Sequence, residues 1–90
     1  MKIDAVDAKR VAEEIVEDWR ESIPGFPWGI VVELATHVVS ERQDIILLRN
    51  TEAASILEQL KRPIPDNYSA GMIAGKANPL IVDVRGRLKK

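Results

Sequence analysis

Three polar side chains that can bind a metal ion are spaced four residues apart in the middle of the chain: Glu33, His37 and Glu41. They belong to the segment 27–41 (PWGIVVELATHVVSE), where apolar residues recur with the 3.6-residue period of an amphipathic helix. Because residues four apart lie on one face of a helix, these carboxylate and imidazole groups could hold a divalent cation. The same residues also form the polar stripe that any surface helix presents to water, so both interpretations stay open.

A second acidic pattern occurs at two places, EEIVE at 13–17 and ERQD at 41–44. The pair resembles the EExxE and ExxD motifs of the all-α, MazG-like nucleoside-triphosphate pyrophosphatases, and the resemblance covers those two motifs only. It implies two helices that bring carboxylates together around Mg²⁺, which holds the triphosphate. Oxygen ligands suit Mg²⁺, and the ion can activate water. On this alternative the metal ligands are Glu14, Glu17, Glu41 and Asp44.

Other catalytic chemistry finds little support in the sequence. The chain has no cysteine, which excludes disulfides, thiolate zinc sites and thiol nucleophiles. Gly75–Lys76 lacks the remaining residues of a phosphate-binding loop, since Ala70 and Ala77 stand at the consensus glycine and Ser/Thr positions. The serines and the single histidine form no recognisable nucleophile motif. We therefore expect a protein that is not an enzyme.

Candidate binding residues lie in two places. Phe26 and Trp28 are in the connector ESIPGFPWG, where large rings either anchor a partner or close the end of the core. The C-terminus has four basic residues within six positions: Arg85, Arg87, Lys89 and Lys90. In an extended segment the first two would share a side and could contact phosphates. We interpret this arm as a protein-binding element, with nucleic acid as the alternative partner.

The periodicity of the chain predicts an α+β fold. We expect helices over 4–22, 27–41 and 51–62, strands over 44–49 and 80–85, and an irregular loop over 63–79 that is rich in proline and glycine. Asp4 is the expected N-cap of the first helix. The β-branched residues of 30–39 leave a strand as the alternative there. Since two strands form a poor sheet, we expect a dimer to complete it. An all-α bundle with an extended C-terminal arm is the other architecture considered.

Size and charge set the remaining expectations. Ninety residues predict one small domain, 1–90, with a basic tail at 86–90 and a core small enough to favour a partner subunit. Residues 1–44 carry ten acidic and five basic side chains, hence −5, whereas residues 45–90 carry four and eight, hence +4. No apolar run approaches the ~20 residues of a membrane span, so we expect a cytoplasmic protein without a membrane partner.

These observations favour a small non-enzymatic regulatory or protein-interaction module that acts as a homodimer and needs no cofactor. One alternative is a nucleic-acid-associated regulator that uses the basic arm. The other is a Mg²⁺-dependent nucleoside-triphosphate pyrophosphatase with the acidic motifs described above.

Overall fold

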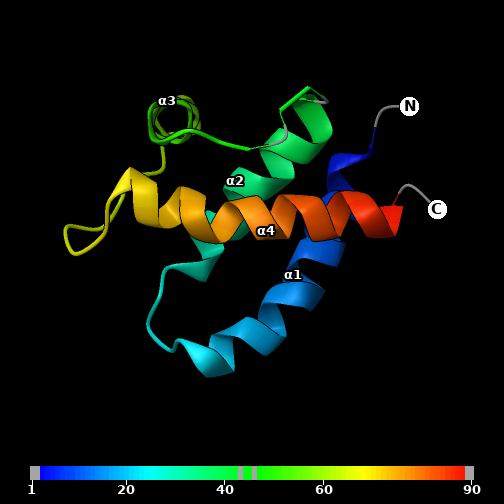
Figure 1. Ribbon diagram of the computed structural model, residues 1–90, viewed down its shortest axis with the longest axis horizontal. Coiled ribbons are helices and arrows are strands. Elements are labelled where there is room, and N and C mark those ends of the chain that lie inside the picture. The colour runs from blue at the N-terminus through cyan, green and yellow to red at the C-terminus, as the bar shows by residue number, and fades with distance from the viewer. Residues whose placement is uncertain (1–2, 43, 46, 89–90) are drawn as a thin grey trace.

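A computed structural model describes residues 3–42, 44–45 and 47–88, and this part of the chain contains four helices and no strand (Figure 1). In chain order the helices are α1 (Ala5–Ser22), α2 (Trp28–Glu41), α3 (Asn50–Gln59) and α4 (Ala70–Leu88). The long α4 crosses in front of α1 and α2, and α3 lies beside its first half. Both α2 and α4 contact every other helix, whereas α1 and α3, as described, do not meet.

The predicted helices 4–22 and 27–41 are confirmed. At the start of α1, the Asp4 Oδ1 atom accepts a hydrogen bond of 2.7 Å from the Val6 N–H, as expected of an N-cap. The strand alternative for 30–39 is wrong, because this stretch is the middle of α2. Its branched side chains are buried nearly all round the helix, since α1 and α4 pack against it and α3 covers a further part. The valine-rich segment is therefore the centre of the core.

The third predicted helix, 51–62, is also present, although α3 ends earlier than expected. At its start, the Glu52 Oε1 atom accepts from the Arg49 N–H at 3.1 Å. At its end, Lys61 has a left-handed φ of 56°, and the Arg62 N–H donates to the Leu57 carbonyl at 2.9 Å. This is the usual way in which a helix stops, with lysine in the place where glycine is more common.

The predicted α+β class is wrong, and the first reason is the segment 44–49. Its described residues form no strand. The Leu48 N–H donates to Asn78 Oδ1 at 2.7 Å, and Asn78 Nδ2 donates to the Leu48 carbonyl at 3.3 Å. The Ile45 carbonyl accepts from the guanidinium of Arg85. Side chains of α4 thus satisfy the backbone groups that a neighbouring strand would otherwise pair with. The predicted sheet, and with it the expectation that a dimer completes that sheet, is wrong for the described residues.

The second reason is α4, which replaces most of the predicted loop 63–79 and all of the predicted strand 80–85. Ser69 caps the helix, its Oγ accepting from the Met72 N–H at 3.2 Å. Pro79 is accommodated inside the helix, at an exposed position. Buried residues recur along it with helical spacing, namely Ile73, Ala74, Ala77, Leu80, Ile81 and Val84. The all-α alternative was right in class, but its extended arm was wrong up to Leu88.

The buried apolar residues of the four helices form one continuous cluster, which Leu48 of the α2–α3 connector joins. None of the described helices has the combination of length and apolar character needed to cross a membrane.

Candidate functional site

All four aromatic residues of the chain meet at one end of the molecule, where two connectors lie together. The ring of Trp28 is 6.0 Å from that of Trp19 and 4.9 Å from that of Phe26, centroid to centroid. Phe26 in turn packs edge-on against Tyr68 at 5.1 Å. Tilted and edge-on ring pairs at such distances stabilise beyond the area that they bury. We call these four residues the aromatic cluster.

Two hydrogen bonds fix the aromatic cluster to the α1–α2 connector. The Trp28 indole N–H donates to the Ile23 carbonyl at 3.1 Å, and the Tyr68 hydroxyl donates to the Gly25 carbonyl at 3.2 Å. Gly25 has a φ of +89°, a backbone conformation that glycine adopts without strain. Trp28 is only 5% exposed and Phe26 is half-buried, so both rings contribute to the core. Their predicted role as an anchor for a partner stays a prediction.

The basic residues of the predicted arm do not form one surface in the part of the chain that is described. Arg85 is turned inward, where its guanidinium donates to the carbonyls of Val38 and Arg42 at the end of α2 as well as to Ile45. Arg87 is exposed, but residues two apart on a helix point in different directions. Lys89 and Lys90 lie outside the described residues. Arg85 therefore acts as a structural residue of the α2–α3 connector.

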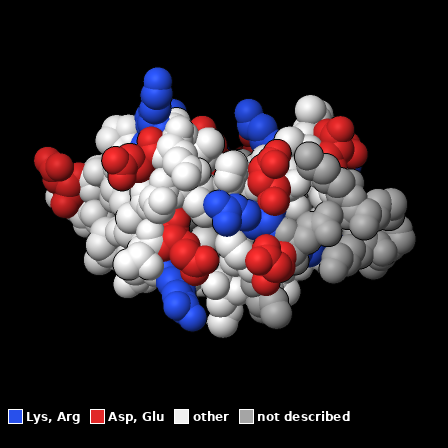
Figure 2. Space-filling model, turned by 90° about the horizontal axis from the view of Figure 1, so that it is seen from above, with Lys and Arg blue, Asp and Glu red and all other residues white. Residues whose placement is uncertain are grey.

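Charges of both signs are mixed over the face seen from above in Figure 2. Lysine and arginine stand next to aspartate and glutamate there, and no broad area of that face has a single sign. A surface that follows a nucleic-acid backbone needs clustered positive charge. The view thus gives no support to the nucleic-acid alternative, which remains a prediction.

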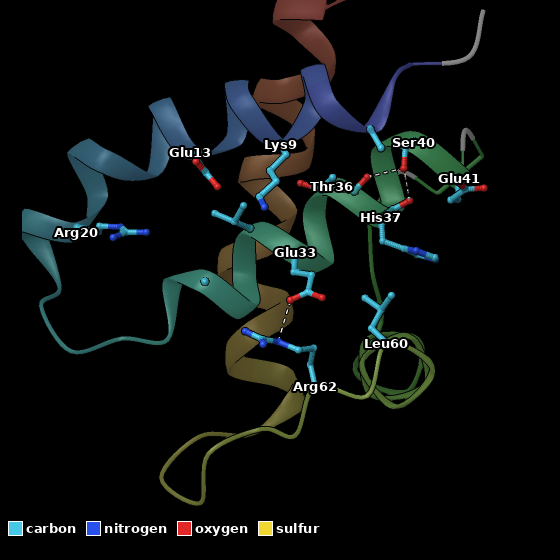
Figure 3. A pocket seen from close by; sticks show the side chains of 13 residues that line it. Lys9, Glu13, Arg20, Glu33, Thr36, His37, Ser40, Glu41, Leu60 and Arg62 are labelled. Carbon is cyan, nitrogen blue, oxygen red and sulfur yellow. Dashed lines mark hydrogen bonds and ion pairs between the residues drawn. The ribbon is translucent and has the colours of Figure 1, made fainter.

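An open groove of about 600 Å³ runs along α2, between α1 on one side and the segment after α3 on the other (Figure 3). Its floor consists of small and apolar residues of α2, among them Gly29, Val32 and Thr36. Lys9 and Glu13 project toward it from α1. The other lining residues are Ala5, Arg20, Glu33, His37, Ser40, Glu41, Leu60 and Arg62. We call this feature the α2 groove.

An ion pair forms part of the rim of the α2 groove. Arg62 Nε lies 2.8 Å from Glu33 Oε2, and both side chains are roughly half exposed. The left-handed turn at Lys61 brings Arg62 to this position, directly after α3 has ended. Exposed pairs of this kind contribute only about 0–1 kcal/mol to stability. The pair can therefore separate at little cost if a bound molecule competes for either charge.

The polar groups of the groove floor differ in whether they have hydrogen-bond partners. The Ser40 hydroxyl donates to the Thr36 carbonyl at 2.8 Å, so it is satisfied within α2. The Thr36 Oγ1 atom is buried and has no hydrogen-bond partner among the described residues. Gly29 faces open space, because a Cβ atom added there would meet nothing within 4 Å.

Glu33, His37 and Glu41 all line the α2 groove, as their four-residue spacing predicts for one face of a helix. Metal binding needs more than this alignment, because successive residues at this spacing are a full turn apart and their ligand atoms must still converge. No group of three or more histidine, aspartate or glutamate side chains among the described residues is placed to hold a metal ion. The geometry therefore does not support a metal site at His37.

The carboxylates that resemble the pyrophosphatase motifs are not brought together either. Glu14 and Glu17 line an exposed surface of α1, away from the α2 groove. Glu41 instead lies beside Ala5, at the start of α1. Ala5 is ~14 Å from Glu14 along the axis of that helix. Asp44 is exposed in the connector that follows. The four predicted Mg²⁺ ligands thus do not share one site among the described residues.

Sequence reasoning missed several residues that shape these features. Asn78 and Arg85 are seven apart, so they lie on one side of α4 and both face the α2–α3 connector. That spacing was visible in the sequence, but it has meaning only once 70–88 is known to be helical. Neither the type nor the spacing of Gly29 and Arg62 indicated that they would line a groove. The groove they help to form arises from residues far apart in the chain.

No protein-family model matches this chain, and neither does any curated protein or solved structure.

Proposed function

We propose that the protein is a small non-enzymatic interaction module that acts as a homodimer and binds a short segment of a partner protein in the α2 groove. The observation that carries this proposal is the groove itself, an open channel of about 600 Å³ with a small-residue and apolar floor. Sites of this size accommodate a few side chains of a bound molecule. An open channel suits an extended or helical peptide, which leaves one side in water.

The charges of the rim support a peptide as the bound molecule. Basic and acidic side chains both line the α2 groove, with Lys9, Arg20 and Arg62 among the first and Glu13, Glu33 and Glu41 among the second. Such a rim complements a segment that also carries both signs, and charge complementarity selects the partner and the register. The exposed Glu33–Arg62 pair can exchange its partners for those of a peptide.

Gly29 offers a direct way to test the α2 groove. Because a side chain at this position meets nothing in the fold, Gly29→Gln should leave the helix intact while its side chain projects into the groove. Glycine is also a poor helix former, so the substitution should not lower stability. Ser55→Gln is the matched control, since Ser55 is exposed on α3 and does not line the groove.

The experiment isolates partners that cross-link to the native protein in its source cells, and then measures the affinity of each for the purified variants. We expect Gly29→Gln to weaken the binding by at least about tenfold and Ser55→Gln to leave it unchanged. Circular dichroism should show the same helix content in both. If a partner binds the two variants equally well, the α2 groove is not the binding site.

A further inference from the structure

The outer face of α4 is apolar although it faces water. Met72 and Val82 are 53% and 54% exposed, and Pro79 between them is exposed as well. Together with the exposed Gly75 and Gly86, these residues follow one another at intervals of three, four, three and four along the helix. This is the spacing of a seam along which one helix packs against another. In Figure 1, α4 lies in front of α1 and α2. At one edge of this face, Lys76 and Pro79 border a hollow that Trp19 and Ser22 of α1 also line.

Packing within the described part of the chain does not require glycine at either of the two glycine positions of this seam. A Cβ atom at Gly75 or at Gly86 would meet nothing within 4 Å. Glycine weakens a helix relative to alanine, so the fold itself gains nothing from either residue. Gly71 is different, because a Cβ atom there would come within 3.0 Å of the Asn50 side chain. The space at Gly75 and Gly86 is available to a molecule outside the chain.

The large and small residues of the seam are arranged so that two antiparallel copies would complement each other. Placing a two-fold axis at Pro79 sets Met72 opposite Gly86 of a second, antiparallel copy, since each is seven residues or ~10.5 Å from the axis. The same axis sets Val82 opposite Gly75 of that copy, at ~4.5 and ~6 Å from it. Each large side chain of the seam would therefore meet a gap in the other helix.

Charges at the edge of the seam distinguish antiparallel from parallel packing. Lys76 precedes Pro79 by three residues, and Asp83 follows it by four, on the same edge of the helix. Antiparallel packing brings each Lys76 to Asp83 of the second copy, and this happens twice. In parallel packing about a two-fold axis along the helices, the same edges of the two copies would lie on opposite sides of the pair, so Lys76 would not reach Asp83 of the second copy. Within the described part of the chain, neither residue makes an ion pair.

We propose that the outer face of α4 is a homodimer interface, in which two copies pack their α4 helices antiparallel about Pro79. The inference rests on the homodimer of the proposed function and names the surface and register that form it. A single pair of helices falls at the low end of interface sizes, below about 1,200 Å² in total. The dimer therefore forms in a concentration-dependent equilibrium with the monomer.

The first test measures the molecular mass of the full chain by sedimentation velocity over a range of concentrations. We expect a reversible monomer–dimer equilibrium that Lys76→Asp and Asp83→Lys each weaken by about tenfold or more, through like charges opposite one another. The double variant Lys76→Asp/Asp83→Lys should regain the lost affinity. Gly75→Leu should also weaken the dimer, while the monomer keeps its fold because the space at Gly75 is open.

The second test uses the absence of cysteine from the chain. Under oxidising conditions Pro79→Cys should form a disulfide with its own copy, since both residues lie at the axis. Met72→Cys should not, because the two Met72 positions would be ~21 Å apart along the pair of helices. Cross-linking of both variants would mean parallel packing and would overturn the proposed register.

The remaining outcomes separate this inference from the proposed function. A protein that stays monomeric at every concentration overturns the interface and the homodimer, while binding in the α2 groove is still decided by Gly29→Gln. A dimer that none of the α4 substitutions affects overturns this surface but leaves the homodimer in place.

Discussion

Two ends of the molecule hold their connectors by different means. At one end, the aromatic cluster packs the α1–α2 connector against the α3–α4 connector through ring contacts. At the other end, the α2–α3 connector is held by Asn78 and Arg85, which reach from α4 to backbone groups of Leu48, Ile45 and the end of α2. The first arrangement depends on buried apolar area, and the second depends on satisfied hydrogen bonds.

The difference shows which losses each end can tolerate. Ring packing varies smoothly with the area that remains buried, so a smaller ring keeps part of the stabilisation. A hydrogen bond to a part-buried backbone group is either made or missing, and a missing one leaves a group that water does not readily reach. The aromatic end should therefore depend on the size of the side chain, and the polar end on its hydrogen-bonding groups.

The largest effect is expected for Trp28→Ala, which removes the central ring of the aromatic cluster. The free energy of unfolding of this variant should be lower than that of the native protein by about 3–5 kcal/mol, the usual cost of deleting a large buried ring. Trp28→Phe should cost clearly less, because much of the apolar area stays. Urea denaturation of both variants measures this. Equal losses for alanine and phenylalanine would mean that the indole hydrogen bond to Ile23, and not the ring area, stabilises this end.

Next in size is Arg85→Met, which keeps the length of the side chain but removes its contacts with three carbonyl oxygens. We expect a loss of about 1.5–3 kcal/mol, in the range of hydrogen bonds from charged groups. Arg87→Met is the matched control, since Arg87 is exposed and substitutions at such positions usually change stability by less than about 0.5 kcal/mol. Similar losses for both would contradict a structural role for Arg85.

Asn78→Ala should cost about 1–3 kcal/mol, because the N–H and carbonyl of Leu48 lose their partners. The loss should be local. Amide hydrogen exchange at Leu48 should become faster, while exchange at Tyr68 in the aromatic cluster should be unaffected. Faster exchange at both amides would show that the two ends are not independent.

The smallest effect is expected for Tyr68→Phe, which keeps the ring and removes only the hydrogen bond to the Gly25 carbonyl. A loss of about 0.5–1.5 kcal/mol is typical of one such bond, and the exposed position favours the lower value. Thermal unfolding should detect it, since ~1 kcal/mol shifts the midpoint by about 4–8 °C in a domain of this size. A loss as large as that of Arg85→Met would remove the distinction between the ends.

Local patterns were sufficient to predict α1, α2 and α3. Their apolar residues recur with helical period, and Asp4 and Glu52 stand where helix starts require them. The same patterns misled at α4, because Pro79 and three glycines weigh against a helix that packing against α1, α2 and α3 nevertheless stabilises. The segment 44–49 was predicted as a strand since its partners, Asn78 and Arg85, lie 30 and 40 residues further along.

The candidate site was predictable only where it lies on one helix. The alignment of Glu33 and His37 followed from spacing alone, because α2 is regular. The approach of Arg62 to Glu33 depends on a turn at Lys61, a residue that gives no turn signal. Tyr68 joins the aromatic cluster across 43 residues of sequence from Gly25, which no local pattern reports. Tertiary packing decides both.

The position of α4 in the chain has a consequence for synthesis. The ribosome makes this helix after α1, α2 and α3, yet it contacts all three and supplies the side chains that hold the α2–α3 connector. Until residues 70–88 have emerged, the valines of α2 lack the helix that covers them. The nascent chain then exposes this apolar surface, and the core of the four described helices is complete only once α4 has docked.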